Sequence, residues 1–248
     1  MSTLTELRKR RFEQAWIYPL CLAAPVLWAG VVDAVPYLWF VLVQAWFLFA
    51  VMVTAHEAVH GAAHRHRGWN RAIGWIGGLM VGASFDLQRR LHLAHHRGDA
   101  SADMERRCVS DGPIAYRLLK RFVGFAWCYG MFPTMPRREQ ARAIAVAAAL
   151  GLIAIASPMQ VLFLWLLPLM LASFGFVSVF VVLPHSDSAF AEWVRARAPW
   201  MTNYHDVHHE HPELPWFLGR AAYRQGRSVE DSVALRVRPE ATVELHEA

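Results

Sequence analysis

Histidines are grouped in this sequence at spacings that suit metal binding. The peptides HLAHH (92–96) and HDVHH (205–209) share the pattern HxxHH, and HEAVH (56–60) has the pattern HxxxH. In a helix, positions i, i+3 and i+4 lie on one face, so each peptide can direct two or three imidazoles toward one point. Imidazole is a ligand for zinc, copper, iron and nickel. One such pair is weak evidence, whereas these three histidine boxes together predict a metal site.

The number of clustered histidines predicts more than one ion. Twelve of the 13 histidines lie within 56–66, 92–96 and 205–211 or at position 185. Zinc takes about four ligands and an octahedral metal about six, so nine or ten imidazoles exceed what one ion needs. The sequence therefore predicts two metals that share a site.

Polar side chains beside the boxes are candidates for orienting the ligands. Glu57, Asp206 and Glu210 are each adjacent to a box histidine, and Asn203 lies just before the third box. An oxygen at such a position can accept the second ring N–H of a metal-bound imidazole and fix its orientation. The alternative for the three acids is a solvated position on a helix surface.

Long apolar runs predict the elements that carry the boxes. The runs cover about 15–32, 35–55, 143–156 and 161–183, in a chain of 248 residues that is 55% hydrophobic. About 20 helical residues cross the ~30 Å of bilayer hydrocarbon. The stretch 72–85 is short and rich in glycine, which favours an interfacial or re-entrant segment. We predict an all-α membrane protein with about four transmembrane helices in two hairpins and a cytoplasmic helical cap that holds the dimetal site.

The distribution of arginine orients these spans. Basic residues at 8–11 precede the first run, the loops 33–36 and 157–160 contain no Arg or Lys, and the segments after the second and fourth runs are rich in Arg. By the positive-inside rule, both termini and the histidine boxes are cytoplasmic. The protein is then integral to the inner membrane, without a cleaved signal peptide. The net charge of +5 fits contact with lipid headgroups, and nothing else in the sequence favours nucleic acid.

The order HxxxH, HxxHH, HxxHH with intervening apolar hairpins resembles the membrane fatty acid desaturase and hydroxylase superfamily, from about residue 50 to residue 225. Within it, AHEAVHGAAHRHRGWN, HLAHHR, LPHSDSAF and NYHDVHHEHPELPWF are similar to cyanobacterial-type beta-carotene hydroxylases and, less closely, carotenoid ketolases. The pattern NYHxxHHxxPxxPW is also similar to small bacterial acyl desaturases. ADMERR (102–107) departs from the acidic Asp-Pro-rich stretch of the hydroxylases.

The resemblance implies a centre of two non-haem iron ions that activates O₂ and oxidises an unactivated C–H bond. Among the lipophilic substrates of this superfamily, a carotenoid ring is preferred, and an acyl lipid is the alternative. The sequence has no GxGxxG nucleotide fingerprint, so reducing equivalents must come from a ferredoxin-like donor with its reductase. Arginines near the boxes, among them Arg89 and Arg97, are candidates to dock that donor, although headgroup contact is the simpler role. Zinc can replace iron in recombinant protein.

The resemblance also implies a ligand set. The implied ligands come from the three boxes, with an additional histidine in LPH: His56, His60, His92, His95, His96, His185, His205, His208 and His209. No catalytic residue is implied beyond this metal site. His64 is a further candidate because it continues the helical face of His60, whereas His66 and His211 are expected to face solvent. One membrane-embedded domain is expected over 1–228, followed by a tail over 229–248.

Two other functions use the same residues differently. HEAVH also fits the zinc-protease pattern HExxH, in which the glutamate is a general base, but a protease leaves both HxxHH boxes unexplained. A metal transporter would place its ligands near the middle of the membrane, and here they follow the cytoplasmic ends of spans. The aromatic residues Trp39, Trp46, Phe47 and Trp165 are candidates to line an apolar substrate channel, or they simply pack in the membrane.

Overall fold

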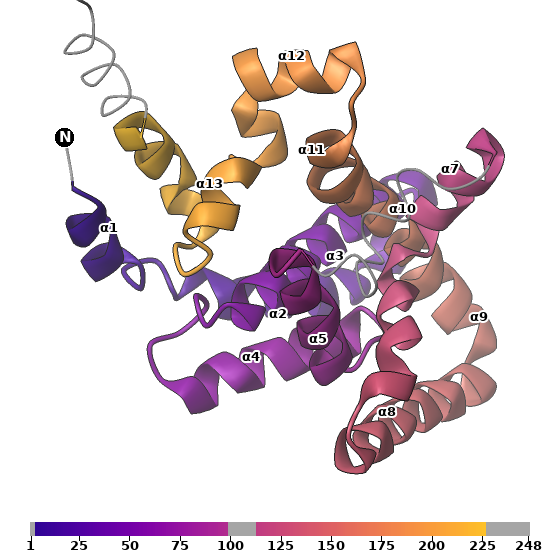
Figure 1. The fold of residues 1–248 in the computed structure, drawn as a ribbon. Helices are drawn as coiled ribbons and strands as arrows, with labels where there is room; N and C mark the ends of the chain where they lie inside the picture. Colours follow the sequence, from indigo (N-terminus) through magenta and orange to yellow (C-terminus); the bar gives the residue numbers. More distant parts are fainter. Residues whose placement is uncertain (1–2, 99–112, 227–248) are drawn as a thin grey trace, which may run out of the picture.

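The computed structural model describes residues 3–98 and 113–226, and all regular elements within these ranges are helical (Figure 1). The expected all-α class is confirmed for this part of the chain. The principal helices are α1 (Leu4–Arg10), α2 (Ile17–Ala29), α3 (Tyr37–Val59), α4 (Arg67–Met80), α5 (Phe85–His96), α7 (Ile114–Phe122), α8 (Arg137–Ala156), α9 (Pro158–Gln160), α10 (Leu167–Phe176), α11 (Leu183–His185), α12 (Ala189–Arg197) and α13 (His205–Glu210). The 3-10 segments are η1 (Val32–Ala34), η2 (Gly124–Thr134), η5 (Pro199–Thr202) and η6 (Trp216–Leu218), and the π-helical segments are η3 (Val161–Leu166) and η4 (Val177–Val182).

Three of these helical stretches are long and apolar enough to cross a membrane. They are Tyr37–Val59, Arg137–Ala156 and the continuous stretch Pro158–His185, which is bounded by α9 and α11. The fourth expected span, α2, has 13 residues and reaches only ~20 Å at ~1.5 Å per residue. It is shorter than its apolar run because the chain forms turns before Ile17 and the helix ends at Gly30. The structure thus gives three helices of spanning length, where the sequence predicted about four.

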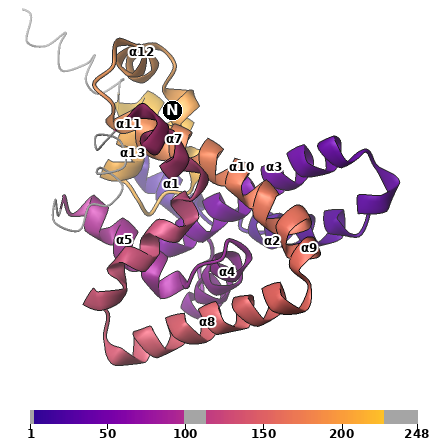
Figure 2. The ribbon, with the colours of Figure 1, turned by 90° about the vertical axis from the view of Figure 1, so that its right-hand side faces the viewer.

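The helix α8 presents apolar side chains outward. Ile144, Leu152 and Ile153 on this helix are exposed, and Figure 2 shows α8 along one edge of the molecule, joined by a turn to α9. A row of exposed branched aliphatic residues is unfavourable in water and is favoured against acyl chains. The hairpin of α8 and the stretch from α9 to α11 therefore has the surface of a membrane element.

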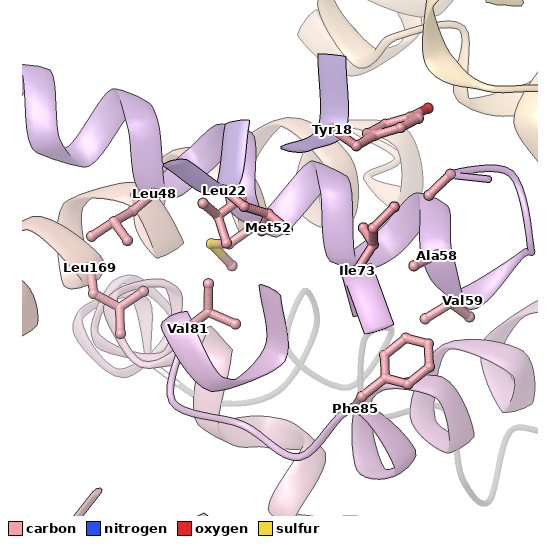
Figure 3. Close-up of a cluster of buried hydrophobic side chains, with 13 residues drawn as sticks. Tyr18, Leu22, Leu48, Met52, Ala58, Val59, Ile73, Val81, Phe85 and Leu169 are labelled. Atoms are coloured by element: carbon pink, nitrogen blue, oxygen red, sulfur yellow. The ribbon is translucent and has the colours of Figure 1, made fainter. Parts of the chain in front are cut away.

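The core forms where α2, α3, α4 and α10 meet (Figure 3). Leu48 and Met52 from α3, Ile73 from α4 and Leu169 from α10 are buried in one cluster. The contact between α3 and α4 depends on Gly77, where an added Cβ would lie 3.2 Å from the Cβ of Ala55. This packing holds the C-terminal end of α3, which carries the first histidine box, against the elements that follow it.

The stretch 72–85 is the second half of α4 and the turn into α5. The turn is tight, because a Cβ on Gly78 would lie 2.8 Å from the carbonyl oxygen of Ala83, and Gly82 has a φ of 75°. The chain thereby reverses and brings α5 back against α3. In the structure, the helical part of this predicted interfacial or re-entrant segment packs on α3.

The N-terminal helix closes on the C-terminal part of the described chain. Leu7 of α1 is buried with Leu214, Leu218 and Ala222, and Arg8 forms an ion pair with Glu213 at 2.8 Å. Figure 1 shows α1 beside the yellow segment that follows α13. These elements pack on α13, which carries the third histidine box, through Val207.

Candidate metal centre

All nine histidines of the implied ligand set come together in the structure. Two groups of four are formed, and the ligand atoms within each group lie within 4.8 Å of one another: His56, His60, His92 and His208 make the first group, and His95, His185, His205 and His209 make the second group. His96 lies between the two groups. Its Nε2 is 3.0 Å from Nε2 of His92 and 3.2 Å from Nε2 of His208, and its ring stacks on His209.

The helices distribute their histidines over both groups. The end of α3 supplies two histidines to the first group, and α11 supplies one to the second. The helices α5 and α13 each supply both groups, because an HxxHH pattern gives three imidazoles within about a 100° arc. A backbone turn directs α13 inward: Asn203 and Tyr204 have φ values of 51° and 56°. Left-handed residues reverse the chain sharply, and asparagine tolerates this conformation better than most residues.

The nitrogen positions fit metal ions. Nε2 of His60 is 2.9 Å from Nε2 of His92, and Nε2 of His205 is 2.9 Å from that of His209. Metal–nitrogen bonds of about 2.0–2.1 Å place the nitrogens of neighbouring ligands about 3–4 Å apart. Both groups therefore have the donors and the spacing to hold one ion each.

Burial favours the neutral, metal-binding form of several of the clustered imidazoles. Burial, with a smaller contribution from the neighbouring imidazoles, lowers the pKa of His60 to about 2, of His96 to about 4 and of His209 to about 3. The pKa values of His205 and His208 are lowered for the same reasons. Each ring therefore keeps a lone pair available at neutral pH.

Glu57 is the best placed of the four predicted orienting residues. Its side chain is buried, with Oε1 3.9 Å from Nδ1 of His56, and Oε2 accepts a hydrogen bond of 3.3 Å from the hydroxyl of Tyr18. The 3.9 Å between the Glu57 carboxylate and the His56 ring is too long for a hydrogen bond, but the two side chains are neighbours. Tyr18 was missed by the sequence reasoning, because it lies 39 residues before Glu57 on an apolar helix and no local pattern connects the two.

The other three residues differ in position. Asn203 lines a small hollow of about 30 Å³ together with His56, Glu57 and His205. Asp206 is exposed and lines a hollow beside the second group, and Glu210 is exposed on α13. For these two acids the structure shows the solvated helix-surface position.

His64 belongs to neither group. Its Nδ1 accepts a hydrogen bond of 3.0 Å from the backbone N–H of His66, and its ring lies near Trp69. The expectation that His64 continues the face of His60 assumed an unbroken helix, but α3 ends at Val59 and Gly61 has a φ of 75°. His66 is exposed as expected, whereas His211 is half-buried instead of facing solvent.

His185 enters the second group with a fixed ring orientation. Its Nδ1 bonds the carbonyl oxygen of Val181 at 2.7 Å, and its Nε2 lies 3.4 Å from Nε2 of His205. Because a carbonyl can only accept, Nδ1 carries the proton, and the Nε2 lone pair faces the group. His185, which belongs to none of the three boxes, therefore lies with the second group.

An apolar cavity of about 100 Å³ reaches the first group. Its wall includes His56 and His92 and otherwise consists mainly of apolar side chains from α3, α5, η2, α10 and η4, among them Met52, Leu91, Phe125, Phe176 and Val181. The aromatic residues expected to line a channel are not among its lining residues: Trp39 and Trp46 are exposed, and Trp165 donates to the carbonyl of Met80. A second, more polar hollow of about 390 Å³ lies against His95, His185 and His209 of the second group.

The described chain thus combines helices of membrane-spanning length with two groups of clustered histidines, and an apolar cavity reaches the first group. Residues 33–238 match the family model described as fatty acid desaturase. The chain is also 30% identical over 192 residues to a beta-carotene ketolase from Paracoccus sp. (strain N81106 / MBIC 01143), and the alignment covers 69% of this chain and 73% of the relative. No solved structure gives a significant match. The chain belongs to the fatty acid desaturase family and is a membrane oxidoreductase with carotenoid-enzyme relatives.

Proposed function

We propose that this protein is an O₂-dependent oxygenase that oxidises a ring C–H bond of a carotenoid at a centre of two iron ions. The observation that carries the proposal is the apolar cavity that ends at His56 and His92. A lipophilic substrate in this cavity would bring a carbon atom to the first group of histidines. The likeness to a beta-carotene ketolase favours a carotenoid.

The nine clustered histidines are the proposed iron ligands. Two iron ions held there would supply the activation of O₂ that oxidation of an unactivated C–H bond requires. His56, His60, His92 and His208 would hold one ion, and His95, His185, His205 and His209 the other, with His96 between them. Imidazole suits iron and zinc alike, and membership of the desaturase family favours iron.

The other residues of the site bind, orient and exclude water. The cavity wall would bind an apolar substrate through the hydrophobic effect and keep water from the reacting carbon. Glu57 would orient His56, and the Val181 carbonyl orients His185. None of these side chains needs to act as an acid or a base.

An acyl-lipid desaturase is the alternative, and the name of the matching family favours it. Oxidation of a ring carbon would give an alcohol, whereas removal of two hydrogens from adjacent chain carbons would give an alkene. Both reactions need the same metal centre and the same exclusion of water. The shape and contents of the apolar cavity would decide between these substrates.

The proposal includes an electron donor and a topology. A ferredoxin-like protein with its reductase would dock on the cytoplasmic face, where Arg89 of α5 and Arg97, which directly follows α5, are exposed. Arg106 and Arg107 lie outside the described residues. Both termini and the metal centre would face the cytoplasm, and residues 1–228 would form one domain with 229–248 as a tail.

Pigment and lipid analysis tests this function. The protein and its His92→Ala variant are each produced in a bacterial host that makes β-carotene, and extracts are compared with the empty host. We expect new, more polar carotenoids with the wild type and none with His92→Ala. Unchanged pigments with an altered acyl profile would support the desaturase, and unchanged pigments and lipids with two bound irons would contradict both functions.

A further inference from the structure

Arg195 binds the two carbonyl groups that flank His185. Its Nη1 donates hydrogen bonds of 2.9 Å to the carbonyl oxygen of Pro184 and of 2.9 Å to that of Ser186. The two contacts span the residue whose imidazole enters the second group of histidines. Hydrogen bonds from a charged donor are stronger than those between neutral groups.

Among the described residues, no backbone N–H donates to either of these carbonyl oxygens, and the local chain path explains why. The helix α11 ends at His185, and Ser186 is extended, with a ψ of 139°. The last carbonyls of a helix have no intrahelical donor, and cationic side chains commonly satisfy them. Arg195 does so from the next helix, 11 residues after Pro184.

The helix α12 is built to present Arg195 at this place. Ser188 caps its N-terminus by accepting a hydrogen bond from the backbone N–H of Ala191. Ala191 and Val194 are fully buried and fix the inward face of the helix. Arg195 follows Ala191 by four residues and lies on that face, whereas Arg197 near the end of the helix is exposed.

We propose that Arg195 is a positioning residue that holds His185 in place as a ligand of the second metal ion. This inference rests on the proposed function, in which His185 binds iron. Val181 fixes the rotation of the imidazole through Nδ1, and Arg195 fixes the backbone on both sides of the same residue. Together they determine where Nε2 points.

The inference predicts an effect on one ion only. No histidine of the first group lies on α11 or α12, so loss of the Arg195 contacts should leave that ion unchanged. Removal of groups that orient a metal ligand typically costs about 10- to 100-fold in metal affinity. A residue that merely stabilises the fold would weaken both sites equally.

The test is the rate of iron loss to a chelator from the purified full-length protein. The variants are Arg195→Ala, Arg195→Lys, the matched control Arg197→Ala on the same helix, and the reference His185→Ala. For Arg195→Ala we expect one of the two irons to leave about 10- to 100-fold faster than in the wild type. That iron should be the one missing from His185→Ala. A double variant that combines Arg195→Ala with His185→Ala should therefore lose its one remaining iron at the wild-type rate. Arg195→Lys, which keeps a cationic N–H donor, should restore part of the retention, and Arg197→Ala should match the wild type.

Two results would overturn the inference on Arg195 alone. The first is that Arg195→Ala retains both irons as the wild type does, while His185→Ala lacks one. The second is that both irons leave faster by the same factor in Arg195→Ala and in Arg195→Lys. If the wild type does not hold two irons, or if His185→Ala keeps both, the proposed metal centre itself is wrong.

Discussion

At the scale of single residues, Glu57 links the first apolar helix to the histidine centre. It is buried, accepts a hydrogen bond from Tyr18 of α2 and lies beside His56. A buried carboxylate needs partners, because leaving it without them costs several kcal/mol. The Tyr18 hydroxyl is one such partner, and we predict that Glu57 also orients the neighbouring imidazole of His56.

The change Glu57→Gln tests that dependence. It keeps the shape of the side chain but removes the charge, so we expect the affinity for the iron of the first group to fall by about 10-fold or more. Tyr18→Phe, which removes one hydrogen bond and no metal partner, should cost about 1 kcal/mol of stability and keep both irons. Iron content and thermal unfolding of the two variants measure these effects. Identical iron loss in both variants would show that the hydroxyl, and not the carboxylate alone, is required.

His64 and His60 provide a second test at this scale. His60 belongs to the first group, whereas His64 bonds the backbone of His66. We expect His60→Ala to lose at least one iron and His64→Ala to keep both, as measured by metal analysis of protein purified at matched expression. Loss of iron from His64→Ala would mean that the end of α3 rearranges around a bound ion.

The clustering of the eight box histidines could be predicted because helical spacing is a local property of the sequence, whereas His185 lies outside the boxes and was implied by the family resemblance alone. An HxxHH peptide shares one face of any helix that contains it, and both α5 and α13 are helical there. His64 could not be assigned in the same way, because α3 ends at Val59 and Gly61, in the left-handed conformation, turns the chain away from the helix axis. Tyr18 and Arg195 act over distances in sequence that no spacing rule connects.

At the scale of elements, the apolar cavity is formed by segments whose contacts could not be predicted from the sequence. The 3-10 segment η2 packs against α10 and η4 through Gly124, where an added Cβ would lie 2.4 Å from Cγ2 of Val177. Gly124 and Val177 both line the apolar cavity. Long apolar runs in the sequence predicted α3 and the stretch from α9 to α11. No periodic pattern in the sequence predicts the 3-10 segment η2 or indicates that α2 is short.

The substitution Gly124→Ala tests the role of this contact. The added methyl must displace Val177 or narrow the cavity, and overpacking of this kind costs about 1–3 kcal/mol. We expect product formation to fall while both irons stay bound. Gly151→Ala is the matched control, because nothing lies within 4 Å of its added Cβ. Unchanged product yield in Gly124→Ala would exclude this cavity as the substrate site.

At the scale of the whole molecule, the proposed reaction requires all the histidines on one side of the bilayer. Residues 33–36 connect α2 and α3 at the end of α3 opposite His56 and His60. The helix α12 follows directly after His185. The arginine distribution predicts that residues 33–36 are periplasmic and that α12 is cytoplasmic.

Labelling of single cysteines tests this topology. In a variant without native cysteines, Ala34→Cys should react with a membrane-impermeant thiol reagent in intact cells. Ala196→Cys on α12 should react only after the membrane is opened. Both positions are exposed, so access to the reagent depends on the side of the membrane and not on burial. The reverse pattern would place the histidine centre in the periplasm and remove access for a cytoplasmic electron donor.

The metal content of the purified wild-type protein tests the central claim most directly. Two groups of four histidines with a ninth between them should hold two iron ions per chain in protein from iron-supplied cells. Substitution of His56 or His60 in the first group, or of His185 or His205 in the second, should each remove one ion preferentially. A single tightly bound zinc that depends on His56 and His60 alone, or ions that exchange freely, would contradict a two-iron oxygenase.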